Sequence, residues 1–334
     1  MQRVLIIQTA FIGDVVLASA MLESLHQAFP TAELDILVRK GNESLFKGHP
    51  FLRDTLIWNK QHNKYKHLWQ ILTQIRRNQY DAVINLQRYA ATGFLTALSG
   101  AKEKIGFNKN PLSALFTKVI QHQMGSSTGL HEIERNQLLL YWPETKLCLP
   151  KLYPTPSDIH FVEQFKQGKY ICIAPSSVWM TKQFPIEKWI AFLQQVPSDI
   201  TIYVLGGSND AALCQEIIDR SGNPLSINLA GKCNFLQSAA LMQDALMNYV
   251  NDSAPMHFCS SVNAPVTAIY CSTIPGFGYG PLSTKSYIVQ INRDLVCRPC
   301  GLHGKKECPQ GHFDCGYKIE IAQIKATVGP SVTL

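Results

Sequence analysis

The sequence predicts an α/β protein built from two Rossmann-like domains, each a doubly wound parallel sheet, that face a central cleft. The chain has 334 residues, which is more than one hydrophobic core usually serves. Its hydrophobic share of 46% and charged share of 16% are typical of a globular chain and exclude disorder over most of its length. Short apolar runs alternate with helical patterns in both halves, and this alternation favours parallel sheets covered by helices on both faces.

Short runs rich in aliphatic and β-branched residues predict the strands. In the first half they are residues 4–8, 34–38, 55–58 and 82–85. In the second half they are residues 170–174, 200–205, 246–250 and 266–270. The stretch between the halves contains four prolines, which disfavour helix: Pro143, Pro150, Pro154 and Pro156. We therefore place the boundary near residue 155 and expect domains at residues 1–155 and 156–334.

The net charge of +7 is concentrated in the first half of the chain. Residues 1–150 contain 17 Lys and Arg against 11 Asp and Glu, whereas residues 151–334 contain 14 against 13. This asymmetry indicates an anionic partner for the first half, namely a phosphorylated substrate, a nucleic acid or an acidic lipid surface. No uncharged apolar stretch approaches the roughly 20 residues needed to span a bilayer, and Asp14 interrupts the N-terminal run that imitates a signal peptide. We expect a soluble or peripheral protein of the cytoplasm.

Residues 9–14 follow the first predicted strand and precede a helix that we expect at residues 15–28. Gly13 permits close approach of the backbone, and Asp14 lies at the start of the helix. Two interpretations of Asp14 stay open, because Asp is a favoured helix cap and is also suited to act as a general base at the mouth of the cleft. The segment lacks the Gly-x-Gly-x-x-Gly spacing of a dehydrogenase dinucleotide site.

Residues 175–185 follow the first strand of the second half and contain Ser176, Ser177 and Lys182. The hydroxyls and the ammonium suit phosphate oxygens, although an isolated lysine is more often only solvated. Residues 251–257 follow a later strand, and Asp252 and Ser253 with the proline after them predict a helix start. The unpaired amides of such a helix start form an anion site suited to a diphosphate.

Two further side chains of the second half have two interpretations each. His257 either faces the core with one satisfied nitrogen or contacts the ligand. Asp210, which follows the strand at residues 200–205 together with Ser208, either accepts ribose hydroxyls or caps a local turn.

A basic segment covers residues 60–77 and contains no acidic residue. Its apolar residues keep helical spacing, so it predicts an amphipathic helix with a basic face. That face is either solvated only, or in contact with acidic lipid headgroups or acceptor phosphates. The basic residues are Lys60, Lys64, Lys66, Arg76 and Arg77, and the apolar ones are Leu68, Ile71, Leu72 and Ile75.

Four of the ten cysteines gather near the C-terminus: Cys297, Cys300, Cys308 and Cys315. A structural zinc ion could be held by four such thiolates. Reduced or redox-variable thiols are the second interpretation, and an iron–sulfur cluster is a third that suits the ligand chemistry less well. The remaining cysteines are scattered and do not suggest a disulfide framework, which favours a reducing compartment.

Four motifs taken together resemble one protein family. They are Ile-Gly-Asp at residues 12–14, Pro-Ser-Ser with Thr-Lys-Gln-Phe-Pro at 175–185, Leu-Gly-Gly-Ser at 205–208 and Asn-Asp-Ser-Ala-Pro-Met-His at 251–257. Their order is similar to that of the ADP-heptose:lipopolysaccharide heptosyltransferases of glycosyltransferase family 9. The resemblance covers nearly the whole chain. It implies a GT-B architecture in which the first domain binds the acceptor and the second binds the nucleotide sugar.

The resemblance implies an inverting glycosyltransferase that moves heptose from ADP-heptose to the inner-core acceptor of lipopolysaccharide. Such an enzyme works at the cytoplasmic face of the inner membrane, as a peripheral protein, and requires no cofactor for catalysis. Asp14 would be the base and Lys182 would stabilise the leaving diphosphate. The expected donor-binding residues are Ser176, Ser177, Ser208, Asp210, Asp252, Ser253, Met256 and His257. The expected acceptor-binding residues are Gly13, Lys60, Lys64, Lys66 and Arg88.

Two other functions stay open at this point. One is a GT-B transferase that uses a different nucleotide sugar. The other is a non-catalytic nucleotide-binding or nucleic-acid-binding protein, which the basic residues around Tyr65 and Trp69 would suit. Asp14 and Lys182 discriminate against a pure binder, because binding alone requires neither a base nor a cation for a leaving group. Nucleic acid is therefore the less favoured partner.

Overall fold

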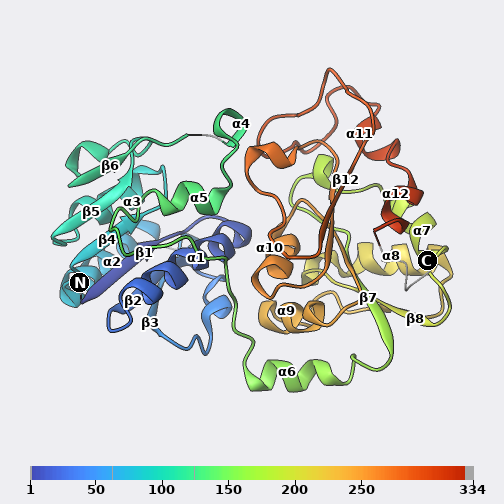
Figure 1. Cartoon of the computed structure of the whole chain (residues 1–334), viewed down its shortest axis with the longest axis horizontal. Coiled ribbons are helices and arrows are strands. Elements are labelled where there is room, and N and C mark those ends of the chain that lie inside the picture. Colours follow the sequence, from blue (N-terminus) through green and yellow to red (C-terminus); the bar gives the residue numbers. More distant parts are fainter. Residues whose placement is uncertain (1, 62, 124, 328–334) are drawn as a thin grey trace. The chain divides into compact units, whose positions relative to one another are not determined.

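Two six-stranded parallel sheets form the two halves of the chain (Figure 1). The computed structural model describes residues 2–61, 63–123 and 125–327. The chain divides into two compact units, Met1–Tyr153 (unit 1) and Pro154–Leu334 (unit 2), so the division lies two residues before the one expected from the prolines. Each unit is a doubly wound α/β sheet with helices on both faces, which confirms the predicted fold class.

Unit 1 has the strand order β3-β2-β1-β4-β5-β6, with all neighbours parallel. Its strands are β1 (Arg3–Ile7), β2 (Glu33–Arg39), β3 (Leu52–Trp58), β4 (Ala82–Asn85), β5 (Glu103–Phe107) and β6 (Lys118–Ile120). Its helices are α1 (Ile12–Ala28), α2 (Lys64–Asn78), α3 (Ala90–Ala97), α4 (Gly125–Thr128) and α5 (Glu132–Gln137).

Unit 2 has the order β12-β11-β10-β7-β8-β9, again with all neighbours parallel. Its strands are β7 (Lys169–Ala174), β8 (Ile200–Val204), β9 (Ser226–Asn228), β10 (Asn248–Asn251), β11 (Val266–Tyr270) and β12 (Ser286–Gln290). Its helices are α6 (Pro156–Glu163), α7 (Ile186–Leu193), α8 (Ala211–Ser221), α9 (Phe235–Gln243), α10 (Ala254–Ser261), α11 (Asp314–Tyr317) and α12 (Ile321–Lys325).

Both sheets reverse their direction of winding at their centre. The reversal lies between β1 and β4 in unit 1 and between β7 and β10 in unit 2. Loops that follow neighbouring strands on either side of such a point diverge, and the crevice that they leave at the carboxyl edge is where open α/β sheets bind ligands. The loops after β1 and β4, and those after β7 and β10, are therefore the places to look for chemistry.

The predicted strands all exist, and most of them are apolar runs that the core buries; β3 at the sheet edge is buried only in part. Residues 4–7 of β1 are fully buried, as are residues 171–173 of β7. The sequence pattern did not predict β5, β6, β9 and β12, which lie at or next to the sheet edges. These strands are short, partly exposed and interrupted by polar residues, so they lack the continuous apolar run that marks a central parallel strand.

Helix α1 begins at Ile12, three residues before the expected start. The backbone N–H of Val15 donates to the carbonyl of Phe11 at 3.2 Å, and Phe11 is the N-cap residue. The expectation that Asp14 caps this helix is therefore wrong, because Asp14 lies inside the first turn.

Helix α2 confirms the predicted amphipathic helix. Its buried residues are Leu68, Ile71, Leu72 and Ile75, while Lys64, Lys66, Arg76 and Arg77 are exposed. In the part of the chain that the structure describes, no helix combines the length and apolar character needed to cross a membrane.

Candidate active site

A group of charged side chains lies at the carboxyl ends of β1, β2 and β3. The Nζ of Lys60 donates to the carbonyl of Thr9 at 2.9 Å and to its Oγ1 at 3.0 Å. The same Nζ lies 4.6 Å from the centroid of the Trp58 ring. Burial, with the charges of Arg39 and Lys64, lowers the pKa of Lys60 to about 8. An anion bound beside Lys60 would stabilise its charged form.

Asp14 lies within the electrostatic reach of this group. Burial lowers the pKa of Arg39, and the charge of Asp14 raises it in part. The guanidinium carbon of Arg39 is 5.1 Å from the centroid of the Phe11 ring, directly before α1. The sequence analysis did not single out Arg39, although a basic residue at the end of a strand next to β1 was the available signal. The start of α1 and Arg39 both attract the negative charge of Asp14.

Buried amide side chains fix the loop that leads to Asp14. The Nδ2 of Asn42 donates to the carbonyl of Ala10 at 3.2 Å. The N–H of Ala10 donates to the Oε1 of Gln8 at 3.3 Å, and the Nε2 of Gln87 donates to the same oxygen. Because Gln8 follows β1 and Gln87 follows β4, this contact joins the two loops across the reversal point. The start of α1 is therefore held rigidly against the sheet.

The other expected acceptor-binding residues fall into two groups. Gly13 lies beside Asp14 in α1, and Lys64 and Lys66 are exposed in the first turn of α2. Arg88 follows β4 and lies elsewhere, with its guanidinium carbon 5.6 Å from the Tyr89 ring centroid. Burial and the charge of Arg88 lower the pKa of Lys109, so Arg88 belongs to a second basic group at the ends of β4 and β5.

In unit 2, Lys182 and Asp252 form an ion pair across the reversal point of the sheet. The Nζ of Lys182 lies 2.6 Å from the Oδ2 of Asp252, with side chains that are 16% and 9% exposed. The same Oδ2 accepts a hydrogen bond from the Oγ1 of Thr273 at 2.7 Å. Lys182 ends a short 3-10 turn (Met180–Lys182) after β7, and Asp252 directly follows β10. The structure thus brings together two expected site residues that are 70 positions apart in the sequence.

Asn251 holds both ends of the loop that carries Lys182. Its Nδ2 donates to the carbonyl of Pro175 at 2.7 Å, and its Oδ1 accepts from the N–H of Phe184 at 2.9 Å. Ser176 and Ser177 are partly exposed in the same loop. The sequence analysis quoted Asn251 only as part of a motif, whereas the structure gives it the role of fastening this loop to β10.

The remaining residues expected to bind the donor differ in exposure. Ser253 is the N-cap of α10 and lies at the carboxyl edge of the sheet. Met256 is fully buried and accepts a hydrogen bond from the Tyr270 hydroxyl at its sulfur, at 3.4 Å. His257 is also buried, with 5% of its surface exposed. Ser253 thus stands beside Asp252 at the carboxyl edge, whereas Met256 and His257 lie further along α10 and are buried. Their contact with a donor stays a prediction.

Ser208 and Asp210 lie in the loop after β8, the strand next to β7. The Oδ2 of Asp210 accepts a hydrogen bond from the N–H of Gly207 at 2.8 Å, which is the local turn role left open above. Gly231 has a φ of +73°, and a Cβ built there would lie 2.8 Å from the Cα of Ser208. The loops after β8 and β9 are therefore packed against each other.

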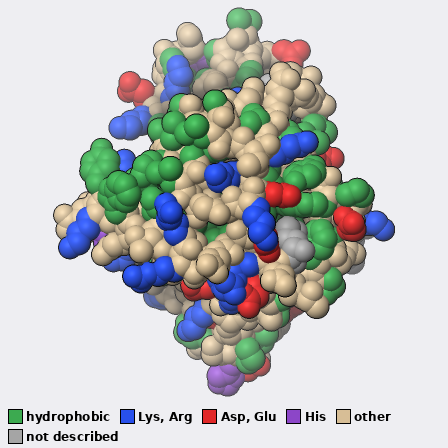
Figure 2. All heavy atoms as spheres, turned by 90° about the vertical axis from the view of Figure 1, so that its left-hand side faces the viewer, with side chains coloured by type: hydrophobic (Ala, Val, Ile, Leu, Met, Phe, Trp, Pro, Cys, Tyr) green, Lys and Arg blue, Asp and Glu red, His purple; other side chains and the backbone are tan. Residues whose placement is uncertain are grey.

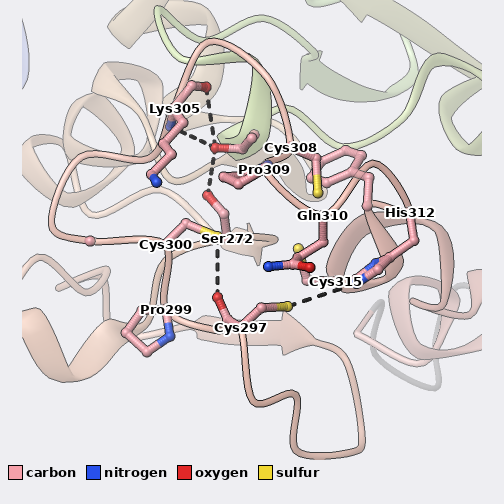
Figure 3. A pocket seen from close by; sticks show the side chains of 13 residues that line it. Ser272, Cys297, Pro299, Cys300, Lys305, Cys308, Pro309, Gln310, His312 and Cys315 are labelled. Atoms are coloured by element: carbon pink, nitrogen blue, oxygen red, sulfur yellow. Dashed lines mark hydrogen bonds between the residues drawn. The ribbon is translucent and has the colours of Figure 1, made fainter.

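The four C-terminal cysteines line one cavity of about 360 Å³ (Figure 3). The sulfur of Cys297 lies 3.9 Å from the Nε2 of His312, and the thiol of Cys300 donates to the carbonyl of Cys297 at 3.3 Å. Burial raises the pKa of Cys315 to about 12. All ten cysteines are free thiols. Among residues 2–61, 63–123 and 125–327, no three His, Cys, Asp or Glu side chains are placed to hold a metal ion.

Known proteins resemble this chain over most of its length. The family model described as Glycosyltransferase family 9 (heptosyltransferase) matches residues 68–310. Lipopolysaccharide heptosyltransferase 3 of Escherichia coli is 24% identical over 282 residues, which are 79% of this chain and 82% of that protein.

Two solved structures have the same fold. The E. coli ADP-heptose lps heptosyltransferase II has a TM-score of 0.78 at 18% identity, covering 98% of both chains. The E. coli heptosyltransferase WaaC with ADP has a TM-score of 0.70 at 18% identity, covering 86% of this chain and 92% of that one. These similarities confirm the expected two-domain architecture.

The lowered pKa of Lys60 can be tested by titration. We expect Lys60 to titrate near pH 8, below its ordinary value of 10.5, in NMR spectra of the chain with ¹³C-dimethylated lysines. Between pH 8 and pH 10.5, Lys60 is mostly protonated in the unfolded chain and mostly neutral in the folded chain. The free energy of unfolding therefore increases as the pH rises through this range. Arg39→Gln removes a neighbouring positive charge and should raise the pKa of Lys60.

Arg77→Gln is the matched control, because it removes an exposed arginine of the same unit and should leave the titration of Lys60 unchanged. A Lys60 signal that titrates near 10.5 in the unsubstituted chain would show that its ammonium is solvated and does not belong to this group.

Proposed function

The chain belongs to glycosyltransferase family 9, and we propose that it transfers heptose from ADP-heptose to an inner-core acceptor of lipopolysaccharide with inversion. Membership of the family makes it a glycosyltransferase. The observation that carries the finer proposal is the Lys182–Asp252 pair at the carboxyl edge of unit 2, next to the start of α10. Relatives with heptosyltransferase names and a structural neighbour with bound ADP support the choice of donor.

The donor diphosphate would bind to the edge formed by the loops after β7 and β10. The ammonium of Lys182 has three N–H donors. Asp252 accepts one of them, and this contact fixes the directions of the other two. The N-terminal amides of α10, which begins after Ser253, attract anions. The hydroxyls of Ser176 and Ser177 are additional donors. Together these groups would stabilise the charge that develops as ADP departs, a role for which no catalytic cofactor is needed.

The acceptor would bind to unit 1, where Arg39, Lys60 and Lys64 supply positive charge around Asp14. In the transfer step the acceptor oxygen forms a bond to the anomeric carbon of heptose from the face opposite the leaving group. The bond from that carbon to the diphosphate oxygen breaks, and ADP leaves with the electron pair. Asp14 takes the proton of the acceptor hydroxyl, as a general base.

Removing the carboxylate of Asp14 tests this assignment. We expect the unsubstituted chain to release ADP from ADP-heptose when deacylated lipopolysaccharide acceptor is present. Asp14→Asn should lower kcat by about 10²–10⁴-fold, the usual contribution of a general base, while ADP affinity measured by calorimetry stays unchanged. Asp54→Asn, at an exposed carboxylate of the same unit, should retain full turnover.

Near-normal turnover by Asp14→Asn would remove Asp14 from the proposed mechanism. Turnover of another nucleotide sugar in preference to ADP-heptose would instead favour the alternative transferase.

We also propose that Cys297, Cys300, Cys308 and Cys315 bind one structural zinc ion. All four line the same cavity, and thiolates are preferred zinc ligands. Metal binding would require the side chains to turn toward one another from the positions described above.

Elemental analysis of chain purified without chelators should find about one zinc ion per chain, as a four-thiolate site requires. Cys300→Ser should lose the metal and lower the melting temperature, whereas Cys233→Ser, a partly buried cysteine outside the cavity, should retain it. Metal-free chain whose four thiols all react in the native state would contradict the zinc proposal and favour reduced or redox-variable thiols.

The exposed face of α2 is proposed to contact anionic lipid headgroups at the inner membrane. Tyr65 and Trp69 are 75% and 59% exposed, and residues 60–77 contain no acidic side chain. Figure 2 shows hydrophobic side chains next to Lys and Arg side chains on the surface that faces the viewer. Exposed aromatic rings beside cations suit the interface of a membrane with anionic lipids.

Sedimentation with vesicles measures this contact. The chain should bind vesicles that contain phosphatidylglycerol and leave pure phosphatidylcholine vesicles unbound, and Trp69→Ala with Lys66→Gln should weaken the binding. Tyr287→Ala with Lys285→Gln, a comparable exposed pair of unit 2, is the control. Equal binding by both double variants would exclude α2 as the contact surface.

A further inference from the structure

Thr181, the residue before Lys182, directs all of its polar groups to two other segments of unit 2. Its N–H donates to the carbonyl of Lys305 at 3.1 Å, and its carbonyl accepts from the N–H of Ser272 at 3.2 Å. Its Oγ1 accepts from the N–H of Lys305 at 2.7 Å and from the hydroxyl of Ser272 at 3.0 Å. Thr181 is 1% exposed, so water cannot replace these partners.

The segment that contains Lys305 also touches the side chain of Lys182. We call residues 297–315 the cysteine-rich segment. Gly304 in this segment has a φ of +74°, and a Cβ built there would lie 2.9 Å from the Cγ of Lys182 and 3.0 Å from the Oγ1 of Thr181. Only a residue without a side chain fits so close. The backbone of the segment therefore packs against the stem of Lys182, while Asp252 holds its ammonium.

Residues 271–273, which follow β11, connect the cysteine-rich segment to the ion pair. The N–H of Cys300 donates to the carbonyl of Ser272 at 2.9 Å, and Arg298 donates to the carbonyls of Cys271 and Thr273 at 2.7 Å each. The side chain of Thr273 donates to Asp252. Both members of the Lys182–Asp252 pair are thus fastened to the three-residue loop on which the cysteine-rich segment rests.

We propose that Thr181 is a positioning residue through which the cysteine-rich segment sets the position of Lys182. The inference rests on the proposed binding of the donor diphosphate by Lys182. Loss of the Thr181 hydroxyl removes the acceptor of the partly buried N–H of Lys305 and the hydrogen bond that fastens the segment to the buried Thr181 side chain. The segment then moves away from the stem of Lys182. By reciprocity, binding of ADP at Lys182 stabilises the segment and slows hydrogen exchange of its backbone.

Thr181→Val tests the inference, because it removes the hydroxyl and keeps the shape of the side chain. We expect it to weaken ADP binding, measured by calorimetry, by about 10-fold, the effect of one buried hydrogen bond to a fixed partner. It should raise the KM for the donor more than it lowers kcat. Thr181→Ser keeps the hydroxyl and should restore ADP affinity. Gly304→Ala, whose added methyl group displaces the stem of Lys182, should weaken ADP binding independently.

Thr267→Val is the matched control. Thr267 is fully buried in the same unit, and its hydroxyl is hydrogen-bonded to Thr327 at 2.6 Å, so its loss should lower the melting temperature without changing ADP affinity. In a Lys182→Ala background, Thr181→Val should have no further effect on ADP binding, because the two residues act through one contact. ADP should slow hydrogen exchange of residues 300–305 in the unsubstituted chain and not in Thr181→Val.

The outcomes separate this inference from the proposed function. An unsubstituted chain that does not bind ADP would contradict the proposed donor. An unsubstituted chain that binds ADP, beside a folded Thr181→Val variant with the same affinity, would overturn the positioning role. Additive losses in the double variant with Lys182→Ala would also overturn it, since Thr181 would then act elsewhere.

Discussion

The reversal of winding between β7 and β10 is the constraint on which the site of unit 2 depends. Two parallel strands lie side by side there, and the chain leaves them toward opposite faces of the sheet. Asn251 at the end of β10 fastens both ends of the loop after β7, so Lys182 is carried to within 2.6 Å of Asp252. Unit 1 repeats the arrangement between β1 and β4, where Gln8 and Gln87 join the two loops and Asp14 lies in the first turn of α1.

The two units use charge in different ways. Unit 1 places several cations close together, and their mutual repulsion adds to burial in lowering the pKa of Lys60. An anionic acceptor bound beside these cations would reduce their repulsion, and this reduction would favour binding. Unit 2 holds its ammonium in an ion pair with Asp252, which fixes the direction of its donors before any ligand binds. Such preorganisation suits a group that must stabilise charge developing on a departing diphosphate.

The sequence predicts the central strands, because β1 and β7 are continuous apolar runs, but not the edge strands β6 and β9, which are short and partly polar. It predicts Lys182 and Asp252 as separate candidates. Their pairing depends on which strands are neighbours, and a linear pattern does not give the strand order. The motif at residues 251–257 also does not tell which face of α10 is buried, and the structure buries both Met256 and His257. Arg39 belongs to no motif, and Thr181 enters one only as the residue before Lys182. Only their contacts give these two residues a role.

The central claim is that the donor diphosphate binds at the carboxyl edge of unit 2 and the acceptor at that of unit 1. Hydrogen exchange of the whole chain, measured by mass spectrometry with and without ADP, tests it most directly, because bound amides exchange more slowly. We expect ADP to slow the exchange of amides in residues 181–184 and 252–257 and to leave the exchange of residues 9–15 unchanged. Protection of residues 9–15 by ADP, with none at residues 181–184, would contradict it.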